Sequence, residues 1–324
     1  MADLNTIKAP IKDEMEKFQP FFRDFLKTKT RLLDIILFYL LKQKGKQIRP
    51  MLVFLTAKLY GNISTHTYNA ATLIELMHTA SLVHDDVVDE SNMRRGFMSI
   101  NAIWKNKIAV LVGDYLLARG LLIAVNQKEY KQLEIVSKAV EEMSEGELLQ
   151  IEKARHLNID EPTYYEIIKK KTAALMIACT TAGASSVGAN NDDIELMSLL
   201  GEYLGIAFQI RDDLFDYETK GCFGKPAGND LKERKITLPL IYALQNSLSS
   251  ERKKMIKKLR QKTKTDGDIE CLMEFVRNKG GIEYAQKTMG KYVDMAKEIL
   301  AKTPNCEAQK SLIDLIDYTI SRKK

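Results

Sequence analysis

Glycine and proline are scarce in this sequence, with 17 glycines and 7 prolines in 324 residues. They make up roughly 5% and 2% of the chain, below the average usage of about 7% and 5%. Because these residues form turns and interrupt helices, their scarcity predicts long helices and argues against many short strands. Hydrophobic residues make up 45% and charged residues 28%, ordinary values that exclude wholesale disorder.

Cysteine is also sparse. The four cysteines, at positions 179, 222, 271 and 306, stand far apart without a C-x-x-C pair. The sequence therefore suggests neither a zinc site nor a disulfide framework. The first residues carry acids early and lack the apolar core of a secretory signal. We expect a location in the reducing cytoplasm.

No charge of one sign dominates, since 49 Lys and Arg stand against 43 Asp and Glu. The densest basic run, residues 252–264, is interpreted as a solvated helix face in preference to a nucleic-acid or anionic-membrane patch. We therefore expect no nucleic-acid partner. Residues 172–191 carry no charge and are long enough to span a bilayer. Their second half is rich in Thr, Ser, Gly and Ala, which favours a buried helix, so we expect no transmembrane segment.

Apolar residues recur at helical spacing along most of the chain. The predicted helices cover residues 30–41, 71–88, 108–125, 133–151, 164–187, 194–215, 237–244, 269–276, 282–300 and 311–320. Thr163 and Glu166, after Pro162, predict a capping box at one helix start. The sequence thus predicts a single all-α domain over residues 1–324, with about ten to thirteen helices around a central cavity. The one long irregular stretch, residues 220–235, has a length that is usually functional or disordered.

Two acidic clusters of the pattern D-D-x-x-D lie at the ends of apolar helical runs. Their members are Asp85, Asp86 and Asp89 in the first and Asp212, Asp213 and Asp216 in the second. Helix positions four apart share a face, so each cluster presents its outer two carboxylates to one site. Hard oxygen ligands suit Mg²⁺, which substrate phosphates usually complete. Acids are locally unfavourable at a helix C-terminus, so their concentration there implies a counter-ion.

Basic residues near these clusters are suited to phosphate oxygens. They are Lys46, Arg49, Arg94, Arg95, Lys171, Lys225 and Lys235. Taken singly, each is more often a solvated surface charge. His78 lies two helical turns before Asp85 on roughly the same face, where its position favours a satisfied core residue until a second substrate is invoked. Together with two acidic clusters, these residues predict a site for a phosphorylated ligand.

These motifs together resemble those of the trans-isoprenyl (polyprenyl) diphosphate synthase family. The matching stretches are GKQIRP at 45–50, HTASLVHDDVVDESNMRRG at 78–96, GD at 113–114, EGELLQ at 145–150, KT at 171–172, QIRDDLFDY at 209–217 and GKPAGNDLKERKITLP at 224–239. They follow the family's order and spacing. The resemblance implies an all-α fold around a deep cavity, usually a homodimer, that condenses an allylic diphosphate with isopentenyl diphosphate.

The resemblance also assigns roles. Mg²⁺ and the allylic diphosphate would be held by the six aspartates of the two clusters with Arg94, Lys171 and Lys235, and Lys225 is a further substrate-binding residue of the same loop. Isopentenyl diphosphate would be held without metal by Lys46, Arg49, His78 and Arg95. Thr172 and Gln209 would shelter the allylic carbocation from water. Peripheral membrane contact is an open option for product release.

The sequence departs from the family's G-G-K-R-x-R-P pattern, because Lys44 replaces the first Gly and Gln47 the Arg or Lys. Other functions stay open beside the synthase. A terpene cyclase needs one substrate site and usually a different second metal motif, and a head-to-head synthase carries D-x-x-x-D motifs. A non-catalytic subunit or a metal-binding scaffold is a further alternative, although both acidic clusters are whole here.

Small residues lie one helical turn before the first acidic cluster. Ala80 and Ser81 stand where short-chain members of the family carry bulky aromatics. A helical turn rises about 5.4 Å, roughly one isoprene unit, so depth limits product length. We therefore expect a product of about C30 to C50, with Met77, Leu73 or a residue of 116–122 as the floor. A C15 to C20 synthase is the alternative, and close helix packing is another reason for the two small side chains.

Overall fold

The computed structural model describes residues 3–43, 45–94, 96–156, 160–218, 228–261 and 263–321. Its helices are α1 (Leu4–Lys8), η1 (Ala9–Ile11), α2 (Lys12–Phe25), α3 (Arg31–Lys42), α4 (Ile48–Tyr60), α5 (Thr65–Val88), α6 (Ile100–Trp104), α7 (Asn106–Asn126), α8 (Tyr130–His156), α9 (Glu161–Ile168), η2 (Lys169–Ala173), α10 (Ala174–Ser185), α11 (Asn191–Phe215), α12 (Asn229–Lys232), α13 (Leu238–Gln245), α14 (Ser249–Arg260), α15 (Asp266–Asn278), α16 (Gly281–Ala301) and α17 (Glu307–Ser321). A two-stranded antiparallel hairpin, β1 (Met93–Arg94) and β2 (Phe97–Met98), follows α5.

The predicted all-α fold is confirmed, and the labelled helices in the described ranges outnumber the ten to thirteen expected. Three of them, α1, α6 and α12, have only four or five residues. The π-helical turn η2 also divides one continuous run into α9 and α10. The excess therefore comes from short helices and from one local change in helix type.

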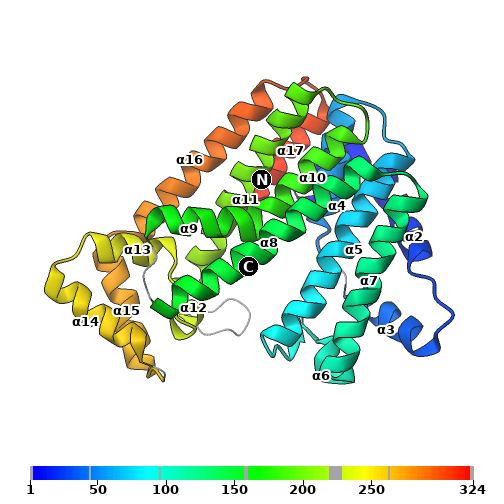
Figure 1. Cartoon of the computed structure of the whole chain (residues 1–324). Coiled ribbons are helices and arrows are strands. Elements are labelled where there is room, and N and C mark those ends of the chain that lie inside the picture. Colours follow the sequence, from blue (N-terminus) through cyan, green and yellow to red (C-terminus); the bar gives the residue numbers. More distant parts are fainter. Residues whose placement is uncertain are drawn as a thin grey trace.

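The centre of the molecule is built around α10. Helices α4, α8 and α11 pack against α10, while α7 packs along α5 (Figure 1). Ten of the twelve residues of α10 are buried, so the uncharged stretch is the buried helix that its composition predicted. Buried apolar residues of α4, α5, α10, α11 and α16 form the largest core cluster. The C-terminal ends of α5 and α11, where the acidic clusters lie, pack in two further core clusters, with Ala80 and Val83 in one and Ile210 and Leu214 in the other.

The start of α9 differs from the predicted capping box. Asp160 is the N-cap residue, and its carboxylate accepts a hydrogen bond from the amide of Thr163 at 3.0 Å. Pro162 falls in the first turn, where its missing N–H has no cost. The helix therefore begins before Thr163, and the capping-box prediction was wrong because Asp160 is the better-placed acceptor.

Helix α7 is the one helix in the described ranges that is long and apolar enough to cross a membrane by length and composition. A core helix of a soluble protein passes the same test, and the inner residues of α7 pack against α5. Cys179, Cys271 and Cys306 are free thiols, and Cys222 lies outside the described residues.

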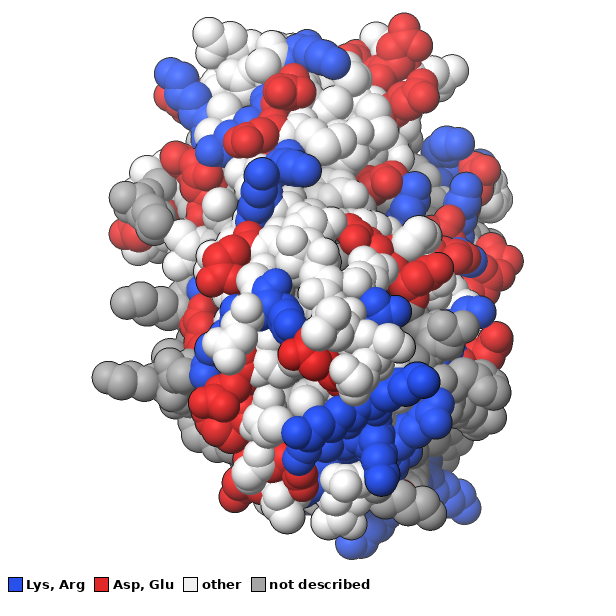
Figure 2. Space-filling view, turned by 90° about the vertical axis from the view of Figure 1, so that its left-hand side faces the viewer, with Lys and Arg blue, Asp and Glu red and all other residues white. Residues whose placement is uncertain are grey.

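The basic run lies largely on α14, as its periodicity predicted. Met255 and Leu259 are buried, while Lys253, Lys254, Lys257 and Arg260 are exposed. Figure 2 shows Lys and Arg side chains gathered in the lower half of this face of the molecule. The predicted exposure of this helix face is confirmed, and the expectation that it binds no nucleic acid stays a prediction.

Candidate active site

The first aspartate cluster ends α5. Asp85 lies in the last turn and Asp89 is the C-cap residue, and both side chains reach solvent. Surrounding protein still removes enough water to raise the pKa of Asp85, and the charges of Asp89 and Glu147 raise it further. Burial and Glu147 likewise raise the pKa of Asp89. Arg94 and Lys171 oppose both shifts without cancelling them. The cluster is therefore a site of uncompensated negative charge.

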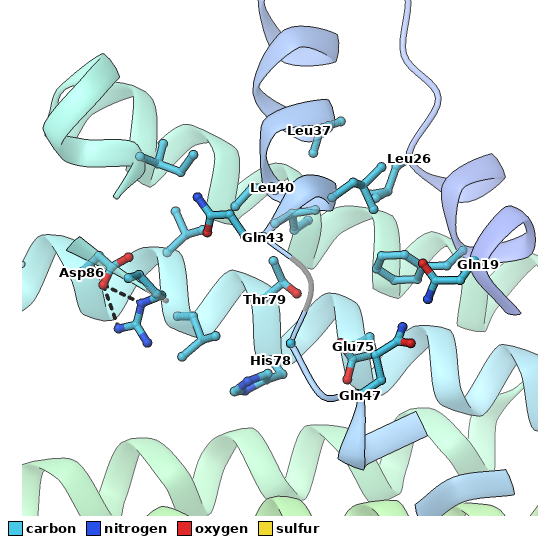
Figure 3. Close-up of a pocket in the computed structure, with 18 of the residues that line it drawn as sticks. Gln19, Leu26, Leu37, Leu40, Gln43, Gln47, Glu75, His78, Thr79 and Asp86 are labelled. Carbon is cyan, nitrogen blue, oxygen red and sulfur yellow. Dashed lines mark hydrogen bonds and ion pairs between the residues drawn. The ribbon is translucent and has the colours of Figure 1, made fainter. Parts of the chain in front are cut away.

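Asp86 lies on a different face of α5. Asp86 is only 3% exposed, and its Oδ1 accepts a hydrogen bond from Arg94 Nε at 2.7 Å and forms an ion pair with Arg94 Nη2 at 2.7 Å. Figure 3 shows this ion pair at the end of α5 that is remote from Glu75. Asn101 donates to the carbonyl of Asp86 at 3.0 Å. Asp86 and Arg94 thus neutralise each other and fix the hairpin to α5.

The second cluster has a different environment. Asp213 is 1% exposed, and its carboxylate accepts hydrogen bonds from Tyr164 Oη at 2.8 Å, Gln209 Nε2 at 2.9 Å and Lys235 Nζ at 3.1 Å. Lys235 also bonds Asp230 at 3.3 Å. Burial would lower the pKa of Lys235, but Asp213 and Asp230 together raise it. Asp213 is therefore the centre of a satisfied, buried polar network.

Asp216 is the C-cap residue of α11 and also contacts the start of the next helix. Its two carboxylate oxygens accept hydrogen bonds from the backbone amides of Asn229 at 2.9 Å and Asp230 at 3.0 Å, at the start of α12. Negative charge is favourable at such a helix N-terminus. Asp212 lies partly exposed on α11. The structure thus gives the three aspartates of this cluster three different surroundings.

Lys171 and Thr172 lie on the π-helical turn η2, which the sequence did not predict. Glycines of two neighbouring helices approach this turn closely. A Cβ added to Gly146 of α8 would lie 2.8 Å from the backbone nitrogen of Lys171, and one added to Gly205 of α11 would collide with Ala173. The π turn therefore depends on two tertiary contacts that admit no side chain. Such turns recur at functional sites.

The π turn connects the two aspartate clusters. Lys171 forms an ion pair with Glu147 and donates a hydrogen bond to Gln150 at 3.3 Å. Thr172 donates to Gln209 Oε1 at 2.7 Å, and Gln209 in turn donates to Asp213. A cavity of about 220 Å³ is lined by Lys171, Thr172, Gln209, Asp213 and Lys235. Five predicted site residues therefore meet around one hollow.

Four further residues belong to this site and were not among those predicted from the sequence, namely Glu147, Tyr164, Asp230 and Glu233. Glu147 lies within the matched stretch at 145–150, so that motif was an available signal. Burial raises the pKa of Asp230 to about 6, with Lys235 opposing the shift. Tyr164 carries no local signal, because only the fold brings it to Asp213.

A second cavity, of about 110 Å³, lies between α2, α3 and α5 (Figure 3). His78 and Glu75 line it together with Gly45 and Gln47 from the segment before α4. His78 is 8% exposed. Gln47 has a left-handed backbone with φ of 57°, a conformation uncommon for a residue other than Gly and one that turns the chain sharply into α4. His78 therefore lies beside the segment before α4, which lines the cavity with Gly45 and Gln47 and not with the basic Lys46 and Arg49.

The remaining basic residues are placed as follows. Arg49 lies in the first turn of α4 and is partly buried. Lys46 is exposed, and its Nζ lies 5.5 Å from the centre of the Tyr318 ring on α17. Arg95 and Lys225, together with Lys44, lie outside the described residues.

The predicted chain-length residues occupy two faces of α5. Met77 and Ser81 are in line with Asp85, and Ser81 Oγ donates a hydrogen bond to the carbonyl of Met77 at 3.1 Å. One turn before Ser81, the side chain of Met77 packs against α7. A Cβ added to Gly120 of α7 would lie 3.5 Å from the sulfur of Met77. Ala80 is fully buried in another cluster, with Leu116 of α7. Ser81 is therefore the small residue directly below the first aspartate cluster.

The donor set fits a divalent cation, although no group of three or more His, Cys, Asp or Glu side chains within the described ranges is arranged to hold a metal. Asp85, Asp89 and Glu147 are hard carboxylate donors. Burial raises the pKa of both aspartates most, and repulsion from Glu147, and at Asp85 also from Asp89, raises it further. A bound cation would relieve that repulsion. Asp86, Asp213 and Asp216 are engaged with protein donors instead.

The helical fold and its paired aspartate clusters define an all-α protein of the isoprenoid synthase type. The sequence model of the family described as "Polyprenyl synthetase" matches residues 30–276. The octaprenyl diphosphate synthase of Escherichia coli (strain K12) is 34% identical over 300 residues, which cover 92% of this chain and 93% of that protein. The chain belongs to the polyprenyl synthetase family, as its motifs indicated.

Solved structures agree with this assignment. A polyprenyl synthase from Caulobacter crescentus CB15, complexed with calcium and isoprenyl diphosphate, is 33% identical with a TM-score of 0.90, covering 99% of this chain and 98% of its own. A geranylgeranyl pyrophosphate synthase from Bacteroides thetaiotaomicron is 40% identical with a TM-score of 0.83, covering 98% and 99%. These relatives are prenyl diphosphate synthases, which confirms the predicted enzyme class.

Proposed function

We propose that the protein extends an allylic diphosphate, such as farnesyl or geranylgeranyl diphosphate, by successive head-to-tail condensation with isopentenyl diphosphate. The observation that carries this proposal is the line formed by Asp85, Ser81 and Met77 on one face of α5. The carboxylate of Asp85, which would bind a cation, lies at one end of this line. The small side chain of Ser81 and the apolar side chain of Met77 follow it along the helix. A substrate with a charged head and a growing apolar tail matches that order.

Lys171, Lys235 and Arg94 would hold the allylic diphosphate, with Lys225 as a further contact. Bound Mg²⁺, held by Asp85 and Asp89 and by Asp212, would supply positive charge that stabilises the departing diphosphate. Asp86, Asp213 and Asp216 would join the metal by exchanging their present protein donors for it. Lys171 already lies between Glu147 and the hollow that Thr172 and Gln209 line. It is therefore placed to exchange its carboxylate partner for a phosphate.

The hydrogen-bonded chain from Thr172 through Gln209 to Asp213 would shelter the allylic carbocation. Thr172 Oγ1 donates to Gln209 Oε1, and this fixes the orientation of the amide. The alkene of isopentenyl diphosphate attacks the cation and forms the new C–C bond. The departed diphosphate accepts the proton whose loss restores a double bond.

Isopentenyl diphosphate keeps its diphosphate, so its site needs cations without metal. Lys46, Arg49, His78 and Arg95 would provide that site, near the turn that Gln47 makes into α4. His78 lies on α5 beside the cavity that Gly45 and Gln47 line. The placement of His78 next to this segment supports the two-site arrangement.

The small side chain of Ser81 supports a long product, of about C30 to C50. A specific observation also favours the short-chain alternative, of about C15 to C20. Met77 closes against α7 near Gly120 one turn below Ser81, so a rigid Met77 would be an early floor. Methionine is flexible and adaptable, and a growing tail can displace its side chain. We therefore favour the long product.

We also propose a homodimer in the cytoplasm. Exposed apolar residues form a stripe along the outer face of α7, at Val110, Leu111, Leu121, Leu122 and Val125, each 41% to 54% exposed. An apolar stripe of this length on a surface helix requires a partner. A second copy of the chain would cover it with the same face.

The test is an elongation assay with labelled isopentenyl diphosphate and farnesyl diphosphate in the presence of Mg²⁺. The products are dephosphorylated and sized. We expect labelled all-trans chains of about C30 to C50. Products that stop at C20 would establish the short-chain alternative, and cyclic hydrocarbons without incorporated label would indicate a cyclase.

A further inference from the structure

Helix α3 is apolar on two opposite faces. Its inner residues Ile36 and Leu37 are 1% and 2% exposed within a core cluster. On the outer face Leu32, Ile35 and Phe38, here called the α3 stripe, are 47%, 49% and 54% exposed. Their spacing of three places them in one line along the helix. A surface helix normally turns polar residues outward, so the α3 stripe needs an apolar partner.

The exposed apolar surface continues from α3 onto the hairpin. Tyr39 Oη donates a hydrogen bond to the carbonyl of Met98 at 2.7 Å, and the rings of Tyr39 and Phe97 are 6.3 Å apart. Phe97 and Met98 are themselves 42% and 49% exposed. Figure 1 shows α3 near α6, on the same side of the molecule. The surface therefore spans two elements, which distinguishes it from a single stray side chain.

Positive charge surrounds the α3 stripe. Between positions 27 and 42 the exposed charged residues are Lys29, Arg31, Lys42 and one acid, Asp34, together with Lys27, which is paired with Asp24 at 2.8 Å. Lys42 Nζ lies 4.5 Å from the centre of the Phe38 ring. An isologous contact between two copies would set these cations against themselves. An anionic lipid surface would attract them instead and accept the apolar side chains between its headgroups.

We propose that the α3 stripe and β2 form a docking surface for a membrane that contains anionic lipids. This proposal rests in part on the proposed function, because every added isoprene unit makes release of the product into water less favourable. Leu32, Ile35 and Phe38 insert at the level of the headgroups, and the flanking Lys and Arg residues pair with lipid phosphates. Docking brings the enzyme to the phase that dissolves its product.

The test is co-sedimentation of the full chain with vesicles of phosphatidylcholine alone or mixed with phosphatidylglycerol. We expect binding to the mixed vesicles that weakens with salt. Ile35→Ser and Phe38→Ser should each reduce binding by roughly tenfold or more, as the loss of one buried apolar side chain predicts. The matched control is Leu248→Ser, because Leu248 is 71% exposed just before α14. This control should bind as the unaltered protein does.

Absence of binding to mixed vesicles, or equal binding by the α3 variants and the control, would overturn the proposal. Analytical ultracentrifugation without lipid separates another case: dissociation of an oligomer by Phe38→Ser would make the stripe an interface between copies, and the proposal would be wrong. The elongation assay in vesicle-free detergent distinguishes the two hypotheses. If elongated product forms but the protein does not bind vesicles, only the proposed docking surface is contradicted. If the protein binds vesicles but forms no elongated product, only the proposed function is contradicted.

Discussion

The two acidic clusters share the pattern D-D-x-x-D but not a physical environment. At the end of α5, Asp85 and Asp89 face solvent, Glu147 and each other, and the pKa of both is raised. At the end of α11, Asp213 is buried and accepts three hydrogen bonds from protein groups. The first cluster therefore holds charge in excess, whereas the core of the second is already neutralised.

This difference shows that a sequence motif determines which side chains are present but not whether their charges are buried or paired. In both motifs the second aspartate forms an ion pair with a basic side chain, Asp86 with Arg94 and Asp213 with Lys235. The outer aspartates differ, because Asp89 ends its helix freely while Asp216 caps α12. The outer aspartates of the first cluster, Asp85 and Asp89, should consequently matter for chemistry alone, whereas Asp213 and Asp216 of the second should matter for chemistry and folding together.

The largest effect is expected at the outer aspartates. Asp85→Ala and Asp212→Ala should each lower turnover by roughly 10²- to 10³-fold, since each removes a preorganised charge from the stabilisation of the departing diphosphate. The fold should survive in both. Steady-state assays at saturating Mg²⁺, with circular dichroism as the control for folding, measure the effect. Near-normal turnover in either variant would remove that carboxylate from the proposed metal site.

Asp213→Ala tests whether the second cluster contributes more to the stability of the fold than the first. Its loss leaves Lys235 with Asp230 alone and frees the hydroxyl of Tyr164 in the interior. We expect a loss of about 2–3 kcal/mol in the free energy of unfolding, below the roughly 3–5 kcal/mol of a fully buried broken pair because Lys235 keeps solvent contact. Asp89→Ala is the control and should unfold at an unchanged or higher urea concentration. Equal losses in both variants would erase the contrast.

Arg49→Ala tests whether isopentenyl diphosphate, which needs no metal, binds at a site separate from that of the allylic diphosphate. Its expected effect is a rise in the KM for isopentenyl diphosphate of roughly tenfold or more, because hydrogen bonds to charged groups contribute about 1.5–3 kcal/mol. The KM for the allylic substrate should stay unchanged. Initial rates with each substrate varied in turn measure both constants. A parallel rise in the two constants would contradict separate sites.

The smallest expected effect on rate, but a change of product, concerns the helix face below the first cluster. Ser81→Phe should shorten the product to about C15 or C20 while ionisation continues. Ala80→Phe should shorten it as well and also reduce stability, because Ala80 is fully buried beside Leu116. Chromatography of the dephosphorylated products gives the answer. An unchanged distribution in both variants would mean that the tail follows another route.

Much of this fold could be predicted because apolar residues recur at helical spacing over stretches too long for strands. Helices α2 and α4 were nevertheless absent from the predicted helices, and in α4 Pro50 to Ala57 are all buried, so that no single face stands out. The short helices α1, α6 and α12 are too brief for periodicity to show. The local pattern at Thr163 also misled, because Asp160 accepts the hydrogen bond that starts α9.

The residues that make up the site could be predicted from the sequence, but their backbone conformation and their ion pairs could not. The motifs selected the residues around the larger hollow, including Lys171, Gln209 and Lys235. They could not show that η2 is a π turn, because that depends on contacts with Gly146 and Gly205 from distant helices. Nor could they show which aspartate of each motif is neutralised. Tertiary partners decide that, and Tyr164 lies 49 positions from Asp213.

The contrast between the clusters is tested most directly by the thermal stability of metal-free Asp85→Asn. A raised pKa in the folded state means that the ionised Asp85 carboxylate costs folding free energy above that pKa, and this cost disappears as the pH falls through it toward the unfolded value. We predict that metal-free Asp85→Asn melts at a higher temperature than the unaltered protein at pH 8, that the difference shrinks toward pH 4, and that turnover is lost. A lower melting temperature at pH 8 would contradict the account.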